Sequence, residues 1–325
     1  MKRIQLENRI PLEPNLPLST PWVIFADPST SCNLQCKFCY HSSNNIKGIM
    51  KWDLYKKIVS DIHLFKSQIK TLRLYAFGEP LLNPKFSDMV KYAKDEQVAE
   101  NIDTTTNGSL FNPKLNLSII EAGIDRINIS VIGINAEQYK SFSNYSINFE
   151  KYVDNIAHLY HNRNKCIIFI KINGDVISKE DQQKFLEIFT PISNGIGIEH
   201  IINCWQLPEL DNIKNKEVGV YGQPISHVEI CSYILYSCCV QFNGEVSACF
   251  LDWNRKLIIG DVKEQSLVDI WNGKPLQQLR KIMLLKQRNI LEICKNCDQL
   301  ISGMPTSVDD YADSLLERYG FNTHA

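Results

Sequence analysis

The chain has 325 residues, of which 44% are hydrophobic and 22% charged, a composition typical of a globular protein with a sizeable core. Its 35 basic and 36 acidic residues give a formal net charge of -1 and are scattered, so no electrostatic footprint for nucleic acid is visible. The N-terminal segment lacks the apolar core of a signal peptide, and no window approaches the roughly 18 consecutive apolar residues of a membrane span. We therefore expect a cytoplasmic protein that binds neither nucleic acid nor membranes.

Residues 1–20 are polar and rich in proline and predict an extended lead-in. From there, short apolar runs typical of strands alternate with segments typical of helices. Strands are expected at 22–26, 71–76, 100–104, 126–132, 166–172 and 196–203, and helices at 52–67, 85–95, 113–122, 149–162 and 179–189. This alternation predicts an α/β fold whose parallel sheet curls into a partial (β/α)6 TIM-like barrel over residues 21–205.

The remainder of the chain has a different character. Residues 206–228 are polar, contain several glycines and prolines, and predict a linker. Residues 229–325 predict a small second domain that opens with a β-hairpin, strands 236–241 and 245–250, joined through the strong turn dipeptide Asn243-Gly244. Helices are expected at 267–271 and 276–285.

Eleven cysteines in a protein expected in a reducing compartment indicate metal or redox chemistry. Cys32, Cys36 and Cys39 lie on one short loop after the first strand, at the barrel end where parallel barrels carry their chemistry. Three thiolates suit an iron-sulfur cluster, and a cube with four irons would keep one iron open. A structural zinc site with His41 as fourth ligand satisfies the same spacing.

The triad, with Phe38 just before its third cysteine, resembles the CxxxCxΦC motif that defines the radical SAM superfamily. In that family the open iron of a 4Fe-4S cluster chelates S-adenosylmethionine (SAM), and one electron cleaves SAM to a 5'-deoxyadenosyl radical. The resemblance implies such a cluster at the triad, with Phe38 near the adenine. It also implies an external electron donor such as flavodoxin or ferredoxin.

Three further segments, each at the end of a predicted strand, resemble motifs of the same family. Residues 77–80 resemble its GGEP motif with the first glycine replaced, which implies that Glu79 accepts hydrogen bonds from the SAM amino group. Residues 105–108 resemble the TNG segment that borders the SAM pocket, and Ser130 matches the serine of an SxDG pattern whose aspartate is absent here. The cofactor-binding residues implied by the resemblance are Phe38, Gly78, Glu79, Pro80, Thr106, Asn107, Ser130 and Lys171. Lys171 has a second interpretation, as a solvated lysine on the barrel rim.

The tail carries a second ligand set, Cys231, Cys249, Cys294 and Cys297, whose four thiolates suit structural zinc by ligand chemistry alone. Their spacing around Gly244 resembles the SPASM or Twitch region, which holds auxiliary clusters. Because no cysteine follows Cys297, the resemblance implies a Twitch-type tail with one auxiliary 4Fe-4S cluster. This arrangement resembles the aminoglycoside dehydrogenases of butirosin biosynthesis.

The other cysteines have less distinctive positions. Cys204, at the end of the sixth predicted strand, is a candidate catalytic residue, because some radical SAM epimerases use such a thiol as a hydrogen donor. Cys238 and Cys239 point to opposite faces of a strand and, with Cys166, are expected in the core.

These features predict a radical SAM oxidoreductase of the dehydrogenase or epimerase type. Its expected substrate is a small, carbohydrate-like molecule: a sugar, an aminosugar or a cyclitol. One alternative is a maturase that modifies a ribosomally made peptide. A zinc-binding interaction protein is a third hypothesis.

Overall fold

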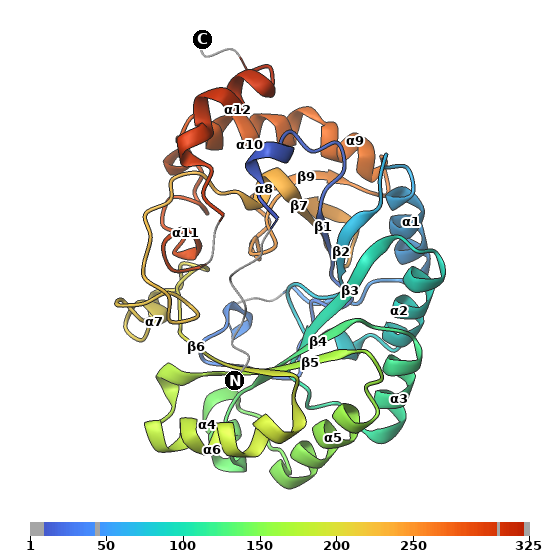
Figure 1. Cartoon of the computed structure of the whole chain (residues 1–325), viewed down its shortest axis with the longest axis vertical. Coiled ribbons are helices and arrows are strands. Elements are labelled where there is room, and N and C mark those ends of the chain that lie inside the picture. The colour runs from blue at the N-terminus through green and yellow to red at the C-terminus, as the bar shows by residue number, and fades with distance from the viewer. Residues whose placement is uncertain (1–9, 43–45, 304–305, 322–325) are drawn as a thin grey trace.

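A curved sheet of nine strands forms the frame of the molecule (Figure 1). The computed structural model describes residues 10–42, 46–303 and 306–321, so residues 1–9 of the expected lead-in lie outside the described residues. The strand order is β6-β5-β4-β3-β2-β1-β7-β8-β9, and all neighbours from β6 to β7 are parallel. The strands are β1 Val23–Ala26, β2 Ile69–Arg73, β3 Ala99–Thr106, β4 Arg126–Val131, β5 Ile167–Asn173, β6 Gly195–Glu199, β7 Ser237–Val240, β8 Glu245–Ser247 and β9 Ile258–Asp261.

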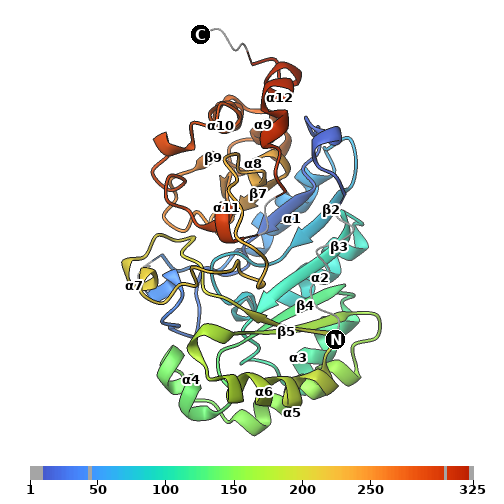
Figure 2. The same ribbon diagram turned by 60° about the vertical axis from the view of Figure 1, so that its left-hand side comes forward.

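Helices cover the convex face of the parallel strands, and the opposite face is concave (Figures 1 and 2). In the barrel they are α1 Trp52–Ile62, α2 Phe86–Asp95, α3 Pro113–Glu121, α4 Ala136–Ser143, α5 Phe149–His161 and α6 Lys179–Phe189. In the rest of the described chain they are α7 Pro208–Asp211, α8 Tyr233–Tyr236, α9 Leu267–Asn272, α10 Lys274–Leu284, α11 Gln299–Ser302 and α12 Ala312–Arg318. No helix among the described residues is long and apolar enough to cross a membrane.

Strand β4 shows why the two faces of the sheet differ. Its side chains alternate, so Ile127 and Ile129 are buried in the core beneath the helices. Arg126, Asn128 and Ser130 lie on the other face and are half-buried. At β4 the concave face is therefore polar where the convex face is apolar, and it is the face available for binding.

The partial barrel expected from the sequence is confirmed, with differences at element ends. The first helix ends at Ile62 rather than at 67, β2 occupies 69–73 rather than 71–76, and β6 ends at Glu199 rather than at 203. The chain leaves β6 early because His200 and Ile201 donate their backbone N–H groups elsewhere, to the carbonyl of Val220 and to the Asp175 carboxylate. Helices α4, α7, α8, α11 and α12 and strand β9 were not predicted.

The tail continues the barrel sheet. Strand β7 pairs in parallel with β1, from Val23 opposite Ser237 to Ala26 opposite Val240. The predicted hairpin is confirmed, with β7 and β8 antiparallel and Gly244 at φ +99°, a conformation that favours glycine at this turn. This pairing sets the tail hairpin beside the strand that leads into the first cysteine loop. The boundaries at 205, 206–228 and 229 stay predictions.

The segment predicted as a linker is partly ordered against the barrel. It contains α7, and residues Val218 and Pro224 form an antiparallel bridge. The carbonyl of Val220 accepts the backbone N–H of His200, just after β6. The segment therefore lies along the barrel edge at β6.

Trp271 on α9 ties the N-terminal segment to the tail. Its side chain is 1% exposed, and its Nε1 donates a hydrogen bond to the carbonyl of Leu18 at 3.0 Å. The guanidinium carbon of Arg280 lies 4.1 Å from the ring centroid, a cation–π contact. The buried indole is thus held by core packing, by a hydrogen bond to Leu18 and by a cation–π contact with Arg280.

We expect Trp271→Ala to lower the free energy of unfolding by about 3–5 kcal/mol, because it opens a large cavity. Trp271→Phe keeps most of the packing and should cost roughly 1–3 kcal/mol through the lost bond to Leu18. Urea unfolding followed by circular dichroism measures both. Tyr311→Ala, at a side chain 48% exposed, is the control and should change little; equal losses in all three variants would contradict the anchoring role.

Candidate functional site

The loop that carries the first cysteine triad follows β1 and is fixed by α4. The backbone N–H groups of Gln35 and Lys37 donate to the carbonyls of Ser143 and Phe142, both at 2.9 Å. Leu34, 1% exposed, inserts between the cysteines into the core. The helix that sequence patterns missed is thus the support of this loop.

The three thiols share one half-buried environment. Burial raises the pKa of Cys32 to about 11 and that of Cys39 to about 12. Burial also raises the pKa of Cys36, and negative charge at Cys39 and Cys32 raises it further. Three thiolates so close together require a cation, and iron supplies that charge. The backbone N–H of Leu34 donates to Cys32 Sγ at 3.5 Å, as hydrogen bonds to cluster sulfurs do. The set fits an iron-sulfur cluster.

Gly78 lets the segment at residues 77–80 pack directly on the approach to that loop. A Cβ atom on Gly78 would lie 2.3 Å from the carbonyl oxygen of Ser29 and 2.4 Å from that of Ser31. The backbone N–H of Glu79 donates to the same Ser31 carbonyl at 2.8 Å. This close approach of two backbones explains the need for glycine and fixes Glu79 beside the loop.

Glu79 is the centre of a buried hydrogen-bond network. Its carboxylate accepts bonds from Thr106 Oγ1 at 2.6 Å, from the N–H of Asn107 at 2.8 Å and from the N–H of Leu81 at 3.0 Å. The amide of Asn107 in turn donates to Asn33 at 3.0 Å and lies 4.0 Å from Cys32 Sγ. Burial raises the pKa of Glu79 to about 7, although the three bonds lower it. The structure thus brings Glu79, Thr106 and Asn107 together with the cysteine loop, as the motifs predict.

The remaining predicted SAM contacts lie on or beside the concave face. Ser130 is opposite Lys171 in the β4–β5 register, and Phe38 is half-buried in the same loop as the triad. Lys171 Nζ lies 2.9 Å from a Glu199 carboxylate oxygen, and its side chain is 25% exposed. Lys171 is therefore an ion-paired side chain and not the solvated rim lysine of the second interpretation. Its role toward SAM stays a prediction, as does that of Ser130.

His41, the fourth ligand of the alternative zinc site, has another partner. Its Nε2 lies 3.0 Å from the carbonyl oxygen of Thr30. Because a carbonyl only accepts, this nitrogen carries the proton and is not available to a metal.

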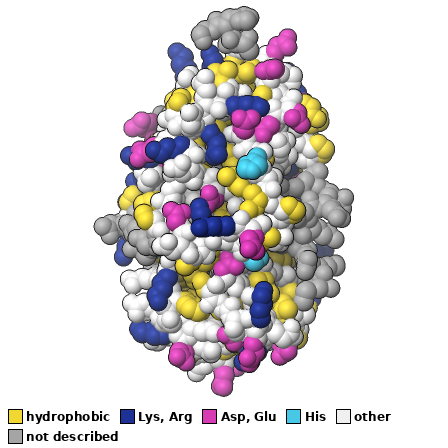
Figure 3. Space-filling view, turned by 90° about the vertical axis from the view of Figure 1, so that its left-hand side faces the viewer, with side chains coloured by type: hydrophobic (Ala, Val, Ile, Leu, Met, Phe, Trp, Pro, Cys, Tyr) yellow, Lys and Arg dark blue, Asp and Glu magenta, His cyan; other side chains and the backbone are white. Residues whose placement is uncertain are grey.

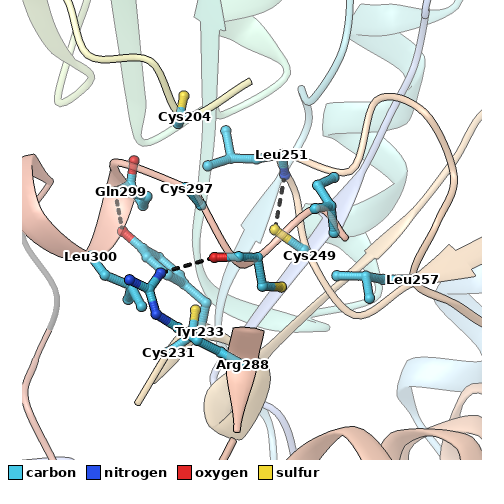
Figure 4. A pocket seen from close by; sticks show the side chains of 12 residues that line it. Cys204, Cys231, Tyr233, Cys249, Leu251, Leu257, Arg288, Cys297, Gln299 and Leu300 are labelled. Carbon is cyan, nitrogen blue, oxygen red and sulfur yellow. Dashed lines mark hydrogen bonds between the residues drawn. The ribbon is translucent and has the colours of Figure 1, made fainter. Parts of the chain in front are cut away.

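The second cysteine set lines one pocket (Figure 4), together with Tyr233, Leu251 and Arg288. The backbone N–H of Leu251 donates to Cys249 Sγ at 3.3 Å. Arg288 donates to the carbonyl of Cys294 at 2.9 Å, so its cation is held at the pocket wall. The four tail thiols Cys231, Cys249, Cys294 and Cys297 converge here from separate segments, as the Twitch resemblance implies.

Burial dominates the electrostatics of this pocket. It raises the pKa of Cys297 to about 12, and the charge at Cys231 raises it further while Arg288 lowers it. Burial likewise raises the pKa of Cys249, with the other thiols adding to the shift. Four half-buried thiols with one neighbouring cation fit a fully ligated cube, whose iron compensates their charge.

Each cysteine of a four-iron cube binds a different iron, so the ligands of a cluster lie farther apart than the ligands of a single metal ion. Over residues 10–42, 46–303 and 306–321, no three His, Cys, Asp or Glu side chains are grouped so that they could hold one metal ion.

Cys204 lies away from the predicted strand end, because β6 stops at Glu199. It is 5% exposed and lines the same pocket as the four tail thiols (Figure 4). Burial raises its pKa strongly, and negative charge at Cys297 and at Cys39 raises it further. Cys204 is thus within electrostatic reach of both cysteine sets. Its role as hydrogen donor stays a prediction.

The other cysteines are core residues, as predicted. Cys166, Cys238 and Cys239 are 5%, 3% and 0% exposed. Cys238 belongs to the core cluster beneath the helices, whereas Cys239 packs with Phe25 on the concave side. The opposite orientation of these neighbours is confirmed.

Two site residues were missed from the sequence. Asp27 follows β1, is fully buried, accepts bonds from the Thr30 hydroxyl and the Phe77 N–H, and has a pKa that burial raises to about 6. A carboxylate directly after a buried strand and before the cysteine loop was a usable signal. No sequence signal marked Arg288 as a site residue, because only the fold brings it to the tail thiols.

Charges of both signs are interspersed on the face shown in Figure 3, in keeping with a net charge of -1.

Among solved structures, BtrN in complex with AdoMet and 2-DOIA matches with a TM-score of 0.57 and 20% identity, covering 85% of this chain and 92% of BtrN. Streptococcus suis SuiB bound to S-adenosylmethionine matches with a TM-score of 0.62 and 13% identity, covering 83% and 70%. At these identities the structures support the fold.

Curated relatives cover different extents of the chain. The tungsten-containing aldehyde ferredoxin oxidoreductase cofactor-modifying protein of Pyrococcus furiosus is 22% identical over 84% of this chain and 86% of its own length. The GTP 3',8-cyclase of Aquifex aeolicus is 26% identical over 59% of this chain, and the match spans 64% of the cyclase.

Family profiles match both parts of the chain. The profile of the Radical SAM superfamily matches residues 27–190, half of the chain, and that of the SPASM iron-sulfur cluster-binding domain matches residues 231–298. Its cofactors are therefore SAM and 4Fe-4S clusters, one for SAM and one auxiliary. The chain belongs to the radical SAM superfamily and carries a C-terminal SPASM-type iron-sulfur domain.

Proposed function

We propose that the protein oxidises a small hydroxylated molecule, a sugar, aminosugar or cyclitol, by radical dehydrogenation. The carrying observation is that residues adjoining both cysteine sets pack in one cluster: the ring of Tyr40, next to Cys39, lies 5.6 Å from that of Trp205, and Phe250, next to Cys249, belongs to the same cluster. A second redox centre near the first can accept the electron that a substrate radical must lose, together with its hydroxyl proton to solvent, to become a carbonyl. When bound, the first cluster and SAM supply the 5'-deoxyadenosyl radical that removes a hydrogen atom.

In this proposal, residues of the chain hold and orient the cofactors. Cys32, Cys36 and Cys39 hold the SAM cluster, and Glu79 accepts hydrogen bonds from the SAM amino group beside Asn107. Cys231, Cys249, Cys294 and Cys297 hold the auxiliary cluster. Phe38, Gly78, Pro80, Thr106, Ser130 and Lys171 complete the SAM pocket. An external flavodoxin or ferredoxin provides the electron.

One observation favours a small molecule over a peptide. The concave face carries ion pairs and tyrosines, groups that hydrogen-bond hydroxyls, among them Lys171 with Glu199 and Arg73 with Tyr75 at 3.1 Å. The extent of the structural matches does not separate the two substrate classes, because the match spans 92% of BtrN, solved with 2-DOIA, and 96% of anSMEcpe, solved with a Cp18Cys peptide.

Epimerisation is a second candidate, favoured by the position of Cys204. Its raised pKa keeps the thiol protonated at neutral pH, and only a protonated thiol can donate a hydrogen atom. In this reaction the substrate radical takes a hydrogen atom from Cys204. The thiyl radical left behind returns to the thiol by taking one electron from the external flavodoxin or ferredoxin and a proton from solvent, and the substrate passes no electron to the auxiliary cluster.

Anaerobic reconstitution should give about eight irons per chain, four for each cluster. Cys36→Ala and Cys294→Ala should each lower that to about four. Only Cys36→Ala should abolish release of 5'-deoxyadenosine with dithionite and SAM, because the other set does not bind SAM. Elemental analysis and chromatography measure these outcomes, with Cys166→Ala as control. Stoichiometric zinc, or a Cys36→Ala variant that still cleaves SAM, would contradict the ligand assignment.

The affinity for SAM should depend on the ionisation of Glu79, whose pKa is about 7. As pH rises through 7 the carboxylate ionises and becomes the stronger acceptor, so wild type should bind SAM more tightly than Glu79→Gln above pH 7. Below pH 6 the carboxyl is neutral and the two proteins should bind alike. Equilibrium dialysis of SAM between about pH 5.5 and 8 gives this difference. A constant difference across that range would rule out titration of Glu79.

Cys204→Ala separates the two reactions. It should leave dehydrogenation and iron content unchanged, whereas it should abolish epimerisation. In deuterated water, an epimerised product should carry deuterium from the thiol at the inverted carbon, as mass spectrometry detects. The buried Cys238→Ala variant controls for packing. An epimerase that keeps full turnover without Cys204 would exclude the donor role, and a loss of about four irons would identify Cys204 as a cluster ligand.

A further inference from the structure

A row of charged side chains crosses the concave face below the predicted SAM site. Arg73, Asp103 and Arg126 are direct register partners on the adjacent strands β2, β3 and β4. Neighbouring strands lie about 4.8 Å apart, so the two arginine backbones are roughly 10 Å from each other with the carboxylate between them. Two cations and one anion give the row an excess of one positive charge.

Arg126 has no counter-ion among the described residues. Its Nε donates to Asn128 at 2.8 Å, and its guanidinium carbon lies 5.1 Å from the ring centroid of Phe169. Within the described chain no carboxylate oxygen lies within 4.0 Å of it, and no hydrogen bond from its terminal nitrogens is present. Burial lowers the pKa of Arg126, an effect that Asp103 partly offsets and that Arg73 strengthens. The charge of Arg126 is therefore incompletely compensated.

Arg73 and Asp103, the other two members of the row, also have hydrogen-bonding groups that are not fully used. Arg73 Nη1 donates to the Tyr75 hydroxyl at 3.1 Å, and its Nε lies 3.5 Å from Asp103 Oδ2. The Asp103 side chain is 10% exposed, yet its second oxygen, Oδ1, has no hydrogen-bond partner. A buried carboxylate oxygen without a donor is costly and is a site for a ligand hydroxyl.

Nearby acidic groups do not compensate this charge. Asp125, next to Arg126 in the chain, is bound by Lys94 at 2.9 Å, and Glu199 is paired with Lys171. Solvent reaches the row, because the Arg73 side chain is 36% exposed.

We propose that this row is a subsite for the anionic group of the substrate, so that the molecule oxidised is a sugar or cyclitol bearing a phosphate or a carboxylate. The terminal nitrogens of Arg126 and Arg73 bind the oxyanion, and Asp103 Oδ1 accepts a neighbouring hydroxyl. Arginine suits this task because its planar fork binds such oxyanions in bidentate fashion. The proposal deepens the proposed function and rests on it for the reaction.

The row lies where it can bind a substrate group that is distant from the reacting carbon. Arg126 and Ser130 lie on the same face of β4, four residues apart, which is about 13 Å along a strand. A substrate held at Arg126 can therefore extend toward the predicted SAM site near Ser130. Binding energy at a distant group then orients the reacting carbon.

The test uses the full chain with reconstituted clusters and saturating SAM, so that the open iron is occupied. Inorganic phosphate, titrated by calorimetry, should bind saturably, and Arg126→Gln should weaken it roughly tenfold or more, since it removes charge-assisted hydrogen bonds. Arg163→Gln is the matched control, because Arg163 also stacks on an aromatic ring, that of Tyr160 at 3.8 Å, but beyond the end of α5. This control should bind phosphate as wild type does.

Glucose 6-phosphate and glucuronate distinguish the two anions, and glucose is the neutral reference. At least one anionic sugar should displace phosphate, and glucose should not; the tighter anion identifies phosphate or carboxylate. Arg126→Lys, which keeps the charge, covers the case that Arg126→Gln misfolds and should bind more weakly than wild type. Absence of saturable phosphate binding, equal binding by wild type and Arg126 variants, or preference for glucose would overturn the proposal.

The subsite and the reaction can fail separately. If an anionic sugar binds through Arg126 but is not oxidised or epimerised, the proposed function fails and the subsite stands. If a neutral cyclitol is oxidised with the same KM in wild type and Arg126→Gln, the function stands and the subsite fails.

Discussion

The parallel pairing of β1 with β7 is the constraint on which the candidate site depends. Strand β1 leads into the loop with Cys32, Cys36 and Cys39, and β7 begins the hairpin that leads to Cys249. Because hydrogen bonds fix these two strands side by side, the tail cannot move independently of the barrel at this edge. The two cysteine sets, far apart in sequence, are thereby held in one electrostatic neighbourhood.

Burial is the second organising effect. It raises the pKa of the cluster thiols and of Asp27 and Glu79, so each of these groups ionises less readily than it would in water. Iron compensates the thiolates, and hydrogen bonds from Thr106 and Asn107 partly compensate Glu79. Binding of the cofactors and ordering of the site are therefore linked through the same charges.

The polar residues of the concave face form two groups. Near the carboxyl ends of the strands, Glu79, Asn107 and Ser130 form the region predicted to bind SAM. Arg73, Asp103 and Arg126, which are register partners across β2, β3 and β4, lie farther from that region along the chain and have unused hydrogen-bonding capacity.

Local patterns in the sequence determined the barrel strands, the hairpin turn and both cysteine sets, because strand periodicity, Asn243-Gly244 and ligand spacing are encoded by neighbouring residues. The motifs also identified Glu79 and Asn107, and in the structure the backbone N–H of Asn107 donates a hydrogen bond to the Glu79 carboxylate. Only the tertiary structure decided that β7 continues the barrel sheet, that α4 supports the first cysteine loop, and that Cys204 lies beside the tail thiols. It alone brought Arg288 to those thiols and aligned Arg126 with Arg73. Such contacts depend on strand register and chain crossings, which no local pattern specifies.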